Sequence, residues 1–154
     1  MERSLVLVKP DGVQRGLIGE ILARFERKGL KVVGMRMLSV PLEMAERHYA
    51  VHADRHFYAG LVEFIVSGPV VAIALEGPDA IATVRRMVGK TMPNEAEPGT
   101  IRGDLGISGL RNLIHASDAS QTAIDELALW FDEGLLDYER AVDAWIVADE
   151  PSRQ

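Results

Sequence analysis

One histidine and its neighbours carry the clearest prospect for chemistry in this sequence. His115 follows the apolar pair Leu113-Ile114, which predicts a short strand, and it precedes Ala116-Ser117-Asp118, where a helix could begin. Free backbone N–H groups and the helix dipole favour anions at such a place. A neutral imidazole is also a competent nucleophile near pH 7, because its ordinary pKa is about 6.5. From spacing alone, a structural histidine is the more common interpretation.

Basic residues gather between residues 85 and 118 of an otherwise acidic chain. Guanidinium groups pair with phosphate oxygens bidentately and keep their charge, so such a group suits a polyphosphate. Scattered surface arginines would give the same composition. The basic residues and the two neutral hydrogen-bonding residues among them are Arg85, Arg86, Lys90, Arg102 and Arg111, with Thr91 and Asn112.

Two further motifs give weaker predictions. Gly89-Lys90-Thr91 is similar to the end of a phosphate-binding loop, but Val84 stands where that loop needs glycine, and the triplet ends a helical pattern. His48, His52 and His56 recur at four-residue intervals, which could align imidazoles for metal binding. No carboxylate completes a metal signature, so a solvated or partly buried stripe near a helix end is the favoured interpretation.

Strands and helices alternate along the chain that must position these residues. The order predicts an α+β fold, a ferredoxin-like split β-α-β sandwich whose four-stranded antiparallel sheet has surrounding helices, packed on one face. Lys9-Pro10-Asp11-Gly12 predicts a turn after the first strand. Strands are predicted at residues 4–8, 30–40, 70–75 and 113–115, and helices at 18–28, 41–49, 58–66, after Pro78 and from Asp118 or Ser120 onward.

Two segments of the second half have their own expectations. Residues 89–109 form too long a connection to be passive, which favours a functional loop. In the helix that follows His115, the apolar spacing of Ile124, Leu127, Ala128 and Phe131 predicts the core face and leaves Glu126 at the surface. Trp145 and Ile146 are expected to anchor the C-terminal part by packing.

Length and composition limit the class of protein. The chain of 154 residues, 47% of them apolar, predicts a single domain over 1–154 with a frayed tail at about 149–154. No apolar run could span a bilayer and the start has no signal-peptide pattern, so the expected location is cytoplasmic. The absence of cysteine excludes disulfide, thiol and Cys-ligated zinc chemistry. A net charge of −6 argues against membrane or nucleic-acid partners.

Four strings of the sequence together form a specific pattern. They are Lys9-Pro10-Asp11-Gly12-Val13-Gln14-Arg15-Gly16, Ser67-Gly68-Pro69-Val70, Pro98-Gly99-Thr100-Ile101-Arg102-Gly103-Asp104 and Arg111-Asn112-Leu113-Ile114-His115-Ala116-Ser117-Asp118. In one register from about Arg3 to Ile146, they closely resemble the nucleoside diphosphate kinase family. The similarity implies a ping-pong reaction in which His115 takes the γ-phosphoryl group of a nucleoside triphosphate and passes it to a nucleoside diphosphate. It also implies Mg²⁺ bound mainly through the nucleotide phosphates, and a homo-tetramer or homo-hexamer.

Roles for individual side chains come from the same resemblance. Charge neutralisation and positioning dominate phosphoryl transfer, which agrees with a cationic set around the phosphates. Asn112 would reach the sugar hydroxyls, Phe57 would stack on the base, and Ser117 with Glu126 would orient the imidazole. The implied catalytic residues are His115, Lys9, Tyr49, Asn112, Ser117 and Glu126, and the implied nucleotide-binding residues are Lys9, Phe57, Arg85, Thr91, Arg102 and Asn112.

The chain departs from the family pattern at Gly109, Leu110, Ala116 and Met92. Ala116 replaces a glycine, and its Cβ would penalise a left-handed backbone. Gly109 removes a branched apolar side chain opposite Phe57, which predicts weaker base affinity on that side. The alternative function is a non-catalytic module that binds nucleotides or regulates a partner. Phosphorylation of the protein by labelled ATP would distinguish the two.

Overall fold

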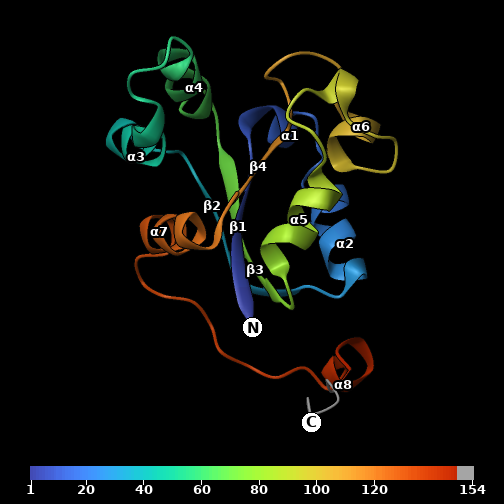
Figure 1. Ribbon diagram of the computed structural model, residues 1–154. Coiled ribbons are helices and arrows are strands. Elements are labelled where there is room, and N and C mark those ends of the chain that lie inside the picture. Colours follow the sequence, from blue (N-terminus) through green and yellow to red (C-terminus); the bar gives the residue numbers. More distant parts are fainter. Residues whose placement is uncertain (149–154) are drawn as a thin grey trace.

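A four-stranded antiparallel sheet in the order β2-β3-β1-β4 forms the centre of the computed structural model, which describes residues 1–148 (Figure 1). β3 lies between β1 and β2 and pairs with both, so the first two strands are split by the third. This arrangement with its helices confirms the predicted α+β ferredoxin-like class. The strands are β1 (Glu2–Val8), β2 (Lys31–Leu38), β3 (Val70–Gly77) and β4 (Ile114–Ala116).

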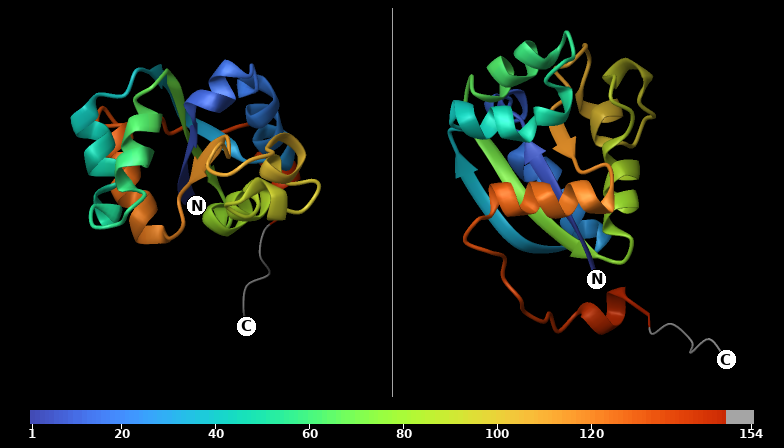
Figure 2. Two further views of the ribbon diagram at one scale, coloured as in Figure 1. Left: turned by 90° about the horizontal axis from the view of Figure 1, so that it is seen from above. Right: turned by 60° about the vertical axis from the view of Figure 1, so that its left-hand side comes forward.

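Helices cover both faces of the sheet (Figure 2). Side chains alternate along β1, so Val6 and Val8 pack into one apolar cluster while Leu5 and Leu7 pack into the other. The prediction of helices on one face is therefore wrong, because a central strand that is apolar at successive positions has two faces to bury. One face carries α1 (Pro10–Gln14), α2 (Ile18–Lys28), α5 (Ala80–Val88) and α6 (Ile101–Leu105), and the other carries α3 (Leu42–His48), α4 (Tyr58–Ile65) and α7 (Ser120–Trp130).

The long connection between α5 and β4 is folded into short helices. It contains the 3₁₀ turn Pro93–Glu95 and α6, and a second 3₁₀ turn, Ala50–His52, follows α3. Thr100 caps α6 by accepting a hydrogen bond from the N–H of Gly103 at 3.0 Å. A Cβ at residue 103 would come within 2.0 Å of the Glu97 carbonyl oxygen, so only glycine permits this approach. The compact loop fixes the position of Arg102 within α6.

Two element boundaries differ from the sequence prediction. Pro10 begins a helix directly after β1, where a turn is predicted, because proline is favoured in the first helical turn. At the start of α7 the cap position is Ala119, so neither Asp118 nor Ser120 caps the helix. Both helices nevertheless begin where the chain leaves a strand of the sheet, close to His115.

The C-terminal part crosses to the far end of the molecule and forms α8 (Asp143–Ile146). Trp145 is 91% exposed, so the prediction that it is a packing anchor is wrong for the isolated chain. Ile146 lies against Gly29. Among the described residues, no helix combines the length and apolar character that crossing a membrane requires. The predicted frayed tail at 149–154 lies outside the described residues.

Candidate active site

His115 is the central residue of β4 and lies directly opposite Leu7 of β1. Opposed residues of an antiparallel pair point to the same face of a sheet. Leu7 packs under α3, α4 and α7, so the imidazole of His115 is directed toward these helices. The strand neighbours Ile114 and Ala116 are buried, whereas the side chain of His115 keeps 22% of its surface exposed. The ring is thus held by the sheet and still accessible to a ligand.

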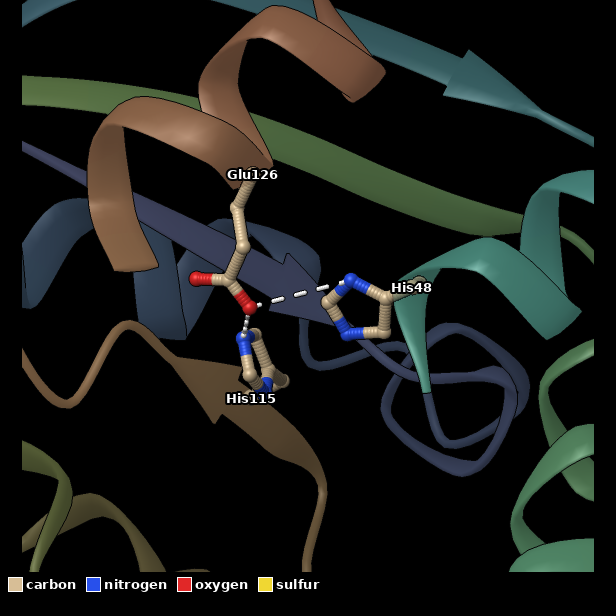
Figure 3. A group of neighbouring side chains, drawn as sticks. All are labelled: His48, His115 and Glu126. Carbon is tan, nitrogen blue, oxygen red and sulfur yellow. Dashed lines mark hydrogen bonds and ion pairs between the residues drawn. The ribbon is translucent and has the colours of Figure 1, made fainter. Parts of the chain in front are cut away.

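A buried carboxylate from α7 contacts His115 (Figure 3). Oε2 of Glu126 lies 2.7 Å from Nε2 of His115, and Oε1 accepts a hydrogen bond from the Ser117 hydroxyl at 2.7 Å. Burial by itself would raise the pKa of Glu126, but the hydrogen bond and charge of His115, followed by Ser117 and His48, bring this pKa below its ordinary value. Glu126 is therefore ionised at neutral pH and can only accept hydrogen bonds.

The ionised carboxylate determines which nitrogen of His115 carries the proton. Because Glu126 can only accept, Nε2 of the neutral imidazole must be the donor, and the lone pair then lies on Nδ1. The ring is oriented by its donor nitrogen, as in other histidines that are held by a carboxylate. This arrangement leaves Nδ1 as the unprotonated nitrogen of the neutral ring, which the sequence alone does not identify.

The apolar spacing of α7 predicts Glu126 at the surface, but Glu126 is buried. The buried residues of this helix are Ala123, Glu126 and Trp130, while Ile124 is 62% exposed. Periodicity assigns the core face to the apolar residues, and here a carboxylate occupies it because His115 and Ser117 satisfy both of its oxygens. The prediction of a solvated Glu126 is wrong.

A buried lysine follows β1 and lies beside the segment that leads into β4. Nζ of Lys9 donates a hydrogen bond to Oδ1 of Asn112 at 2.9 Å, and both residues are buried. Burial and then the positive charge of Arg102 lower the pKa of Lys9 to about 8, although Asp11 acts in the opposite direction. Lys9 therefore holds a positive charge at neutral pH at the cost of desolvation, and an arriving anion would relieve that cost.

Arg102 fastens the α5–β4 loop to the strand that carries His115. Its guanidinium donates to three backbone carbonyl oxygens: Ile114 at 2.6 Å, Gly89 at 3.1 Å and Asn112 at 3.2 Å. Burial and the nearby charge of Arg85 lower the pKa of Arg102 to about 10, so it remains charged at neutral pH. A fixed cation of this kind needs little reorganisation when a phosphate arrives.

Two more of the predicted phosphate-binding residues lie in the same network. Arg85 donates to the carbonyl oxygen of Ala116, the residue after His115, at 3.4 Å. Asn112 donates from Nδ2 to the backbone carbonyl oxygen of Thr91 at 3.0 Å. This bond does not involve the Thr91 side chain, and the residue is exposed. Lys9, Arg85, Thr91, Arg102 and Asn112 are thus connected to one another around the residues that flank His115.

Leu113, whose backbone is in the left-handed region, connects Asn112 to the strand that carries His115. Leu113 has φ = +73°, and the N–H of Ile114 donates to the carbonyl of Asn112 at 2.8 Å across it, as in a three-residue turn. Such a conformation is unfavourable for a non-glycine residue and needs support from its surroundings. Asp11 accepts from the Leu113 N–H at 3.0 Å, and the Lys9 N–H donates to the Leu113 carbonyl at 2.9 Å. The sequence predicts Leu113 in a strand and Asp11 in a turn, and it does not reveal this contact between them.

A cavity of about 320 Å³ opens between α3 and α7 beside His115. Tyr49, Asp118 and Glu126 contribute to its walls. Burial, followed by the negative charge of Glu126, raises the pKa of Tyr49, so its hydroxyl stays protonated. Phe57 is not among the residues that line this cavity. It is half-buried at the start of α4, and its ring centroid lies 5.3 Å from that of His52 and 5.3 Å from that of His56. The structure therefore separates the predicted base-stacking residue from the groups that surround the imidazole.

His48 is a site residue that the sequence interpretation misses. The predicted stripe of three histidines does not form, because α3 ends at His48 and the chain then turns through residues 50–52. His48 is buried, with its ring 4.6 Å from that of His115, whereas His56 is exposed. The indole N–H of Trp130 donates to Nδ1 of His48 at 3.1 Å. Only the docking of α3 against α7 reveals these contacts.

One cluster of the described residues has metal-ligand spacing, with ligand atoms of His48, His115 and Glu126 all within 4.8 Å of one another. Mg²⁺ prefers oxygen ligands and retains water, so two imidazoles and one carboxylate that is already hydrogen-bonded do not suit it. The residues predicted to bind phosphate, Lys9, Arg85 and Arg102, are cations and offer no metal ligands. These residues are compatible with a magnesium ion that is bound by the oxygens of a polyphosphate and not by protein side chains.

The departures from the family pattern have little effect on the backbone near His115. Leu113 and Asp79 are the non-glycine residues with positive φ in the described chain, so Ala116 is extended and the predicted left-handed penalty is absent. Gly109 has φ = +53° with open space beside its Cα. Leu110 and Met92 are partly exposed, and nothing in the structure assigns an effect to either.

A half-buried imidazole whose strand is bonded by fixed cations suits phosphoryl transfer, and this site on an α+β fold is typical of a phosphotransferase. The family model described as nucleoside diphosphate kinase matches residues 2–135. A nucleoside diphosphate kinase of Picosynechococcus sp. is 57% identical over 147 residues, which cover 95% of this chain and 99% of the relative.

Solved structures agree with this match. A halophilic nucleoside diphosphate kinase from Halobacterium salinarum in complex with CDP has a TM-score of 0.92 and 50% identity, covering 95% of this chain and 98% of that one. A family protein from Babesia bovis has a TM-score of 0.92 and 48% identity, covering 96% and 100%. The chain belongs to the nucleoside diphosphate kinase family. It transfers the γ-phosphoryl group of a nucleoside triphosphate such as ATP to a nucleoside diphosphate, by the family's ping-pong mechanism through a phosphohistidine.

Proposed function

We propose that His115 is the residue that carries the phosphoryl group and that Nδ1 is its attacking atom. The supporting observation is the hydrogen bond from Nε2 to ionised Glu126, which leaves the lone pair on Nδ1. Nδ1 attacks the γ-phosphorus, the bond from that phosphorus to the β,γ-bridging oxygen breaks, and the nucleoside diphosphate leaves with the electron pair. In the second half-reaction a β-phosphate oxygen of another diphosphate attacks the same phosphorus and the nitrogen leaves.

Glu126 and Ser117 orient the imidazole and stabilise its charge in this proposal. Phosphorylation at Nδ1 makes the ring cationic while Nε2 keeps its proton, and the adjacent carboxylate favours that state. Ser117 fixes the other oxygen of Glu126 and is itself held by the Leu5 N–H at 3.0 Å. Tyr49, with its protonated hydroxyl in the cavity beside His115, is positioned to donate to the phosphoryl group.

The nucleotide contacts follow from the cationic network. Lys9, Arg85 and Arg102 neutralise the phosphates, and the exposed Thr91 hydroxyl donates to them. Asn112 reaches the sugar hydroxyls, and Phe57 stacks on the base, which tolerates all bases because each has a π face. The CDP complex of the Halobacterium salinarum relative supports nucleoside di- and triphosphates as partners. Mg²⁺ is the proposed cofactor, and when bound to the phosphates it neutralises charge that develops during transfer.

Labelling separates this proposal from a non-catalytic nucleotide-binding module. The protein is incubated with γ-labelled ATP and separated from free nucleotide, and the label is then tested for stability. An acid-labile, alkali-stable label that a second nucleoside diphosphate removes as the corresponding triphosphate supports the enzyme. Nucleotide binding without protein-bound label would contradict the proposal and support the module.

Replacing Glu126 by glutamine is expected to lower kcat by about 10²-fold, because the neutral amide no longer stabilises the cationic phosphorylated ring. KM for the triphosphate should change little, since Glu126 bonds to His115 and Ser117 and is not one of the proposed phosphate-binding residues. Steady-state kinetics measure both parameters. Glu46→Gln, an exposed residue of α3, is the matched control. An unchanged kcat for Glu126→Gln would be inconsistent with its proposed role.

Gly109→Val should restore the branched side chain opposite Phe57 and lower KM for every base by a few-fold, the value of one partly buried apolar contact. The positive φ at residue 109 makes the substitution strained, so Gly109→Ala serves as the control for the backbone effect. KM values measured across several nucleotides test this prediction. Equal KM values in the native protein and Gly109→Val would show that the missing side chain does not weaken base affinity.

Self-association as a homo-tetramer or homo-hexamer is also part of the proposal. β2 is an edge strand that pairs with β3 alone among the strands of the sheet, and Met35 and Met37 on it are 56% and 59% exposed. An exposed apolar edge strand is a favourable surface for pairing with a second copy. We further propose that the chain works as one domain over 1–154, in the cytoplasm, where its nucleotide substrates are abundant. Sedimentation of the full chain would determine the assembly.

A further inference from the structure

A buried tryptophan and a buried histidine form a hydrogen-bonded pair directly behind the active site. Trp130 ends α7 and His48 ends α3, and the indole Nε1 lies 3.1 Å from Nδ1 of His48 with their rings nearly perpendicular. Figure 3 shows His48 facing Glu126 and His115 from the side of α3. Neither residue touches the reacting atoms in the proposed function, which leaves their pairing without an assigned role.

The direction of this hydrogen bond fixes the protonation of His48. An indole N–H can only donate, so Nδ1 of His48 must carry a lone pair and the proton of the neutral ring must lie on Nε2. Burial is the main cause that lowers the pKa of His48, to about 3. His115, Lys9 and His52 lower it further, whereas Glu126 raises it. His48 is therefore neutral over the working pH range and has one preferred tautomer.

The tautomer matters because one carboxylate oxygen lies between two imidazoles. Oε2 of Glu126 is 2.7 Å from Nε2 of His115 and 3.7 Å from Nδ1 of His48. With Nδ1 of His48 unprotonated, that nitrogen and Oε2 of Glu126 are both acceptors and form no hydrogen bond. Of the two histidines, only His115 then donates to Glu126. If the proton of His48 moved to Nδ1, the same oxygen would face two donors and the bond that orients His115 would weaken.

A charged His48 would have a second effect. The rings of His48 and His115 meet edge to face with centroids 4.6 Å apart. Phosphorylation of Nδ1 makes the ring of His115 cationic in the proposed mechanism, and a second imidazolium at this distance would oppose that charge. Neutral His48 in the Nε2–H form avoids both the competition for Glu126 and the repulsion.

We propose that Trp130 is a positioning residue: its indole N–H holds His48 in the Nε2–H tautomer and thereby reserves Glu126 for His115. The proposal rests on His115 as the phosphorylated residue. It adds a buried pair, Trp130 and His48, that acts through Glu126 and contacts neither substrate nor the phosphoryl group. It also accounts for a histidine and a tryptophan that are both removed from solvent behind the catalytic carboxylate.

Nitrogen NMR of the native protein with labelled histidine rings tests the tautomer directly. The expected signature of His48 is one protonated nitrogen, Nε2, and one unprotonated nitrogen, Nδ1, unchanged from pH 5 to pH 8. A proton on Nδ1 or a doubly protonated ring at pH 7 would overturn the proposal. Because this measurement does not depend on activity, failure of the phosphohistidine reaction would leave its result intact and would be recognised separately by the labelling experiment.

Trp130→Phe removes the donor and keeps an aromatic ring. We expect kcat to fall about tenfold, the effect of weakening one charge-assisted hydrogen bond, with KM nearly unchanged. The loss should be nearly constant over the working pH range, because burial keeps His48 neutral and only its tautomer changes. Phe25→Leu is the control for lost core volume, since Phe25 is fully buried on the opposite face of the sheet and has no polar role.

A second background separates hydrogen bonding from packing. His48→Met removes the competing donor, so adding Trp130→Phe to His48→Met should lower kcat no further than the Phe25→Leu control does. An equal loss from Trp130→Phe in the native and His48→Met backgrounds would mean that tryptophan acts by packing alone, and the proposal would be rejected. Should Trp130→Phe fail to fold, the NMR signature of the native protein still decides the question.

Discussion

Replacing His115 by glutamine is expected to eliminate the phosphoenzyme and to slow phosphoryl transfer by on the order of 10⁴-fold or more. Glutamine approximates the size of the imidazole and can still hydrogen-bond to Glu126, but its amide nitrogen has no nucleophilic lone pair. Without a covalent carrier the group must pass directly between two nucleotides, which would have to occupy one site together. A coupled assay measures the rate, and γ-labelled ATP measures the phosphoenzyme.

The chain provides a matched control for this change. His56→Gln alters an exposed histidine that makes no contact with His115, so the phosphoenzyme should form in full. Residual labelling of His115→Gln at the native level would place the phosphoryl group on another residue. Native turnover by His115→Gln would refute the assignment of His115 as well, whatever the labelling result.

Lys9→Met is expected to lower kcat/KM by about 10²–10³-fold, the usual effect of removing one fixed group that stabilises transition-state charge. Methionine retains much of the apolar stem, so the loss should come from the charge. The melting temperature should be unchanged or higher, because burial disfavours charged Lys9 in the folded protein. Lys31→Met, a half-buried lysine on β2 far from His115, is the control.

The pH dependence gives an independent measurement of the same group. The pKa of Lys9 is lowered to about 8, so the native protein loses this positive charge as the pH rises above 8. We expect kcat/KM for the triphosphate to fall above pH 8, well before Arg102 loses its charge with a pKa of about 10. In Lys9→Met the decline between pH 8 and pH 10 should be absent. A decline that survives the substitution would have to come from another residue.

Much of the fold can be predicted from the sequence because it depends on local patterns. The apolar runs of β1 and β3 predict buried central strands, and their alternation with amphipathic helices predicts the split β-α-β order. The same patterns do not show that both faces of the sheet are covered. A run that is apolar at every position is compatible with one covered face or two, and only the docking of α3, α4 and α7 decides between them.

The candidate site, like the fold, can be predicted from the sequence only in part. The sequence places His115 after a short strand and gathers Arg85, Arg102 and Asn112 in the segment around it, since these residues are close along the chain. Their resemblance to a known family supplies the roles. The left-handed turn at Leu113, which joins Asn112 to His115, depends on Asp11 and Lys9 more than 100 residues away and has no local signal.

By itself, the sequence predicted the class of fold and the cationic segment before His115, because each depends on residue type and short-range spacing, whereas the role of His115 came from the family resemblance. Only the tertiary structure decided that Glu126 is buried, that Nδ1 of His115 holds the lone pair, and that His48 and Trp130 lie behind the carboxylate. These facts depend on how α3 and α7 pack against one face of the sheet. Periodicity expects apolar side chains there, whereas a buried polar group is stable only where partners from distant segments satisfy it.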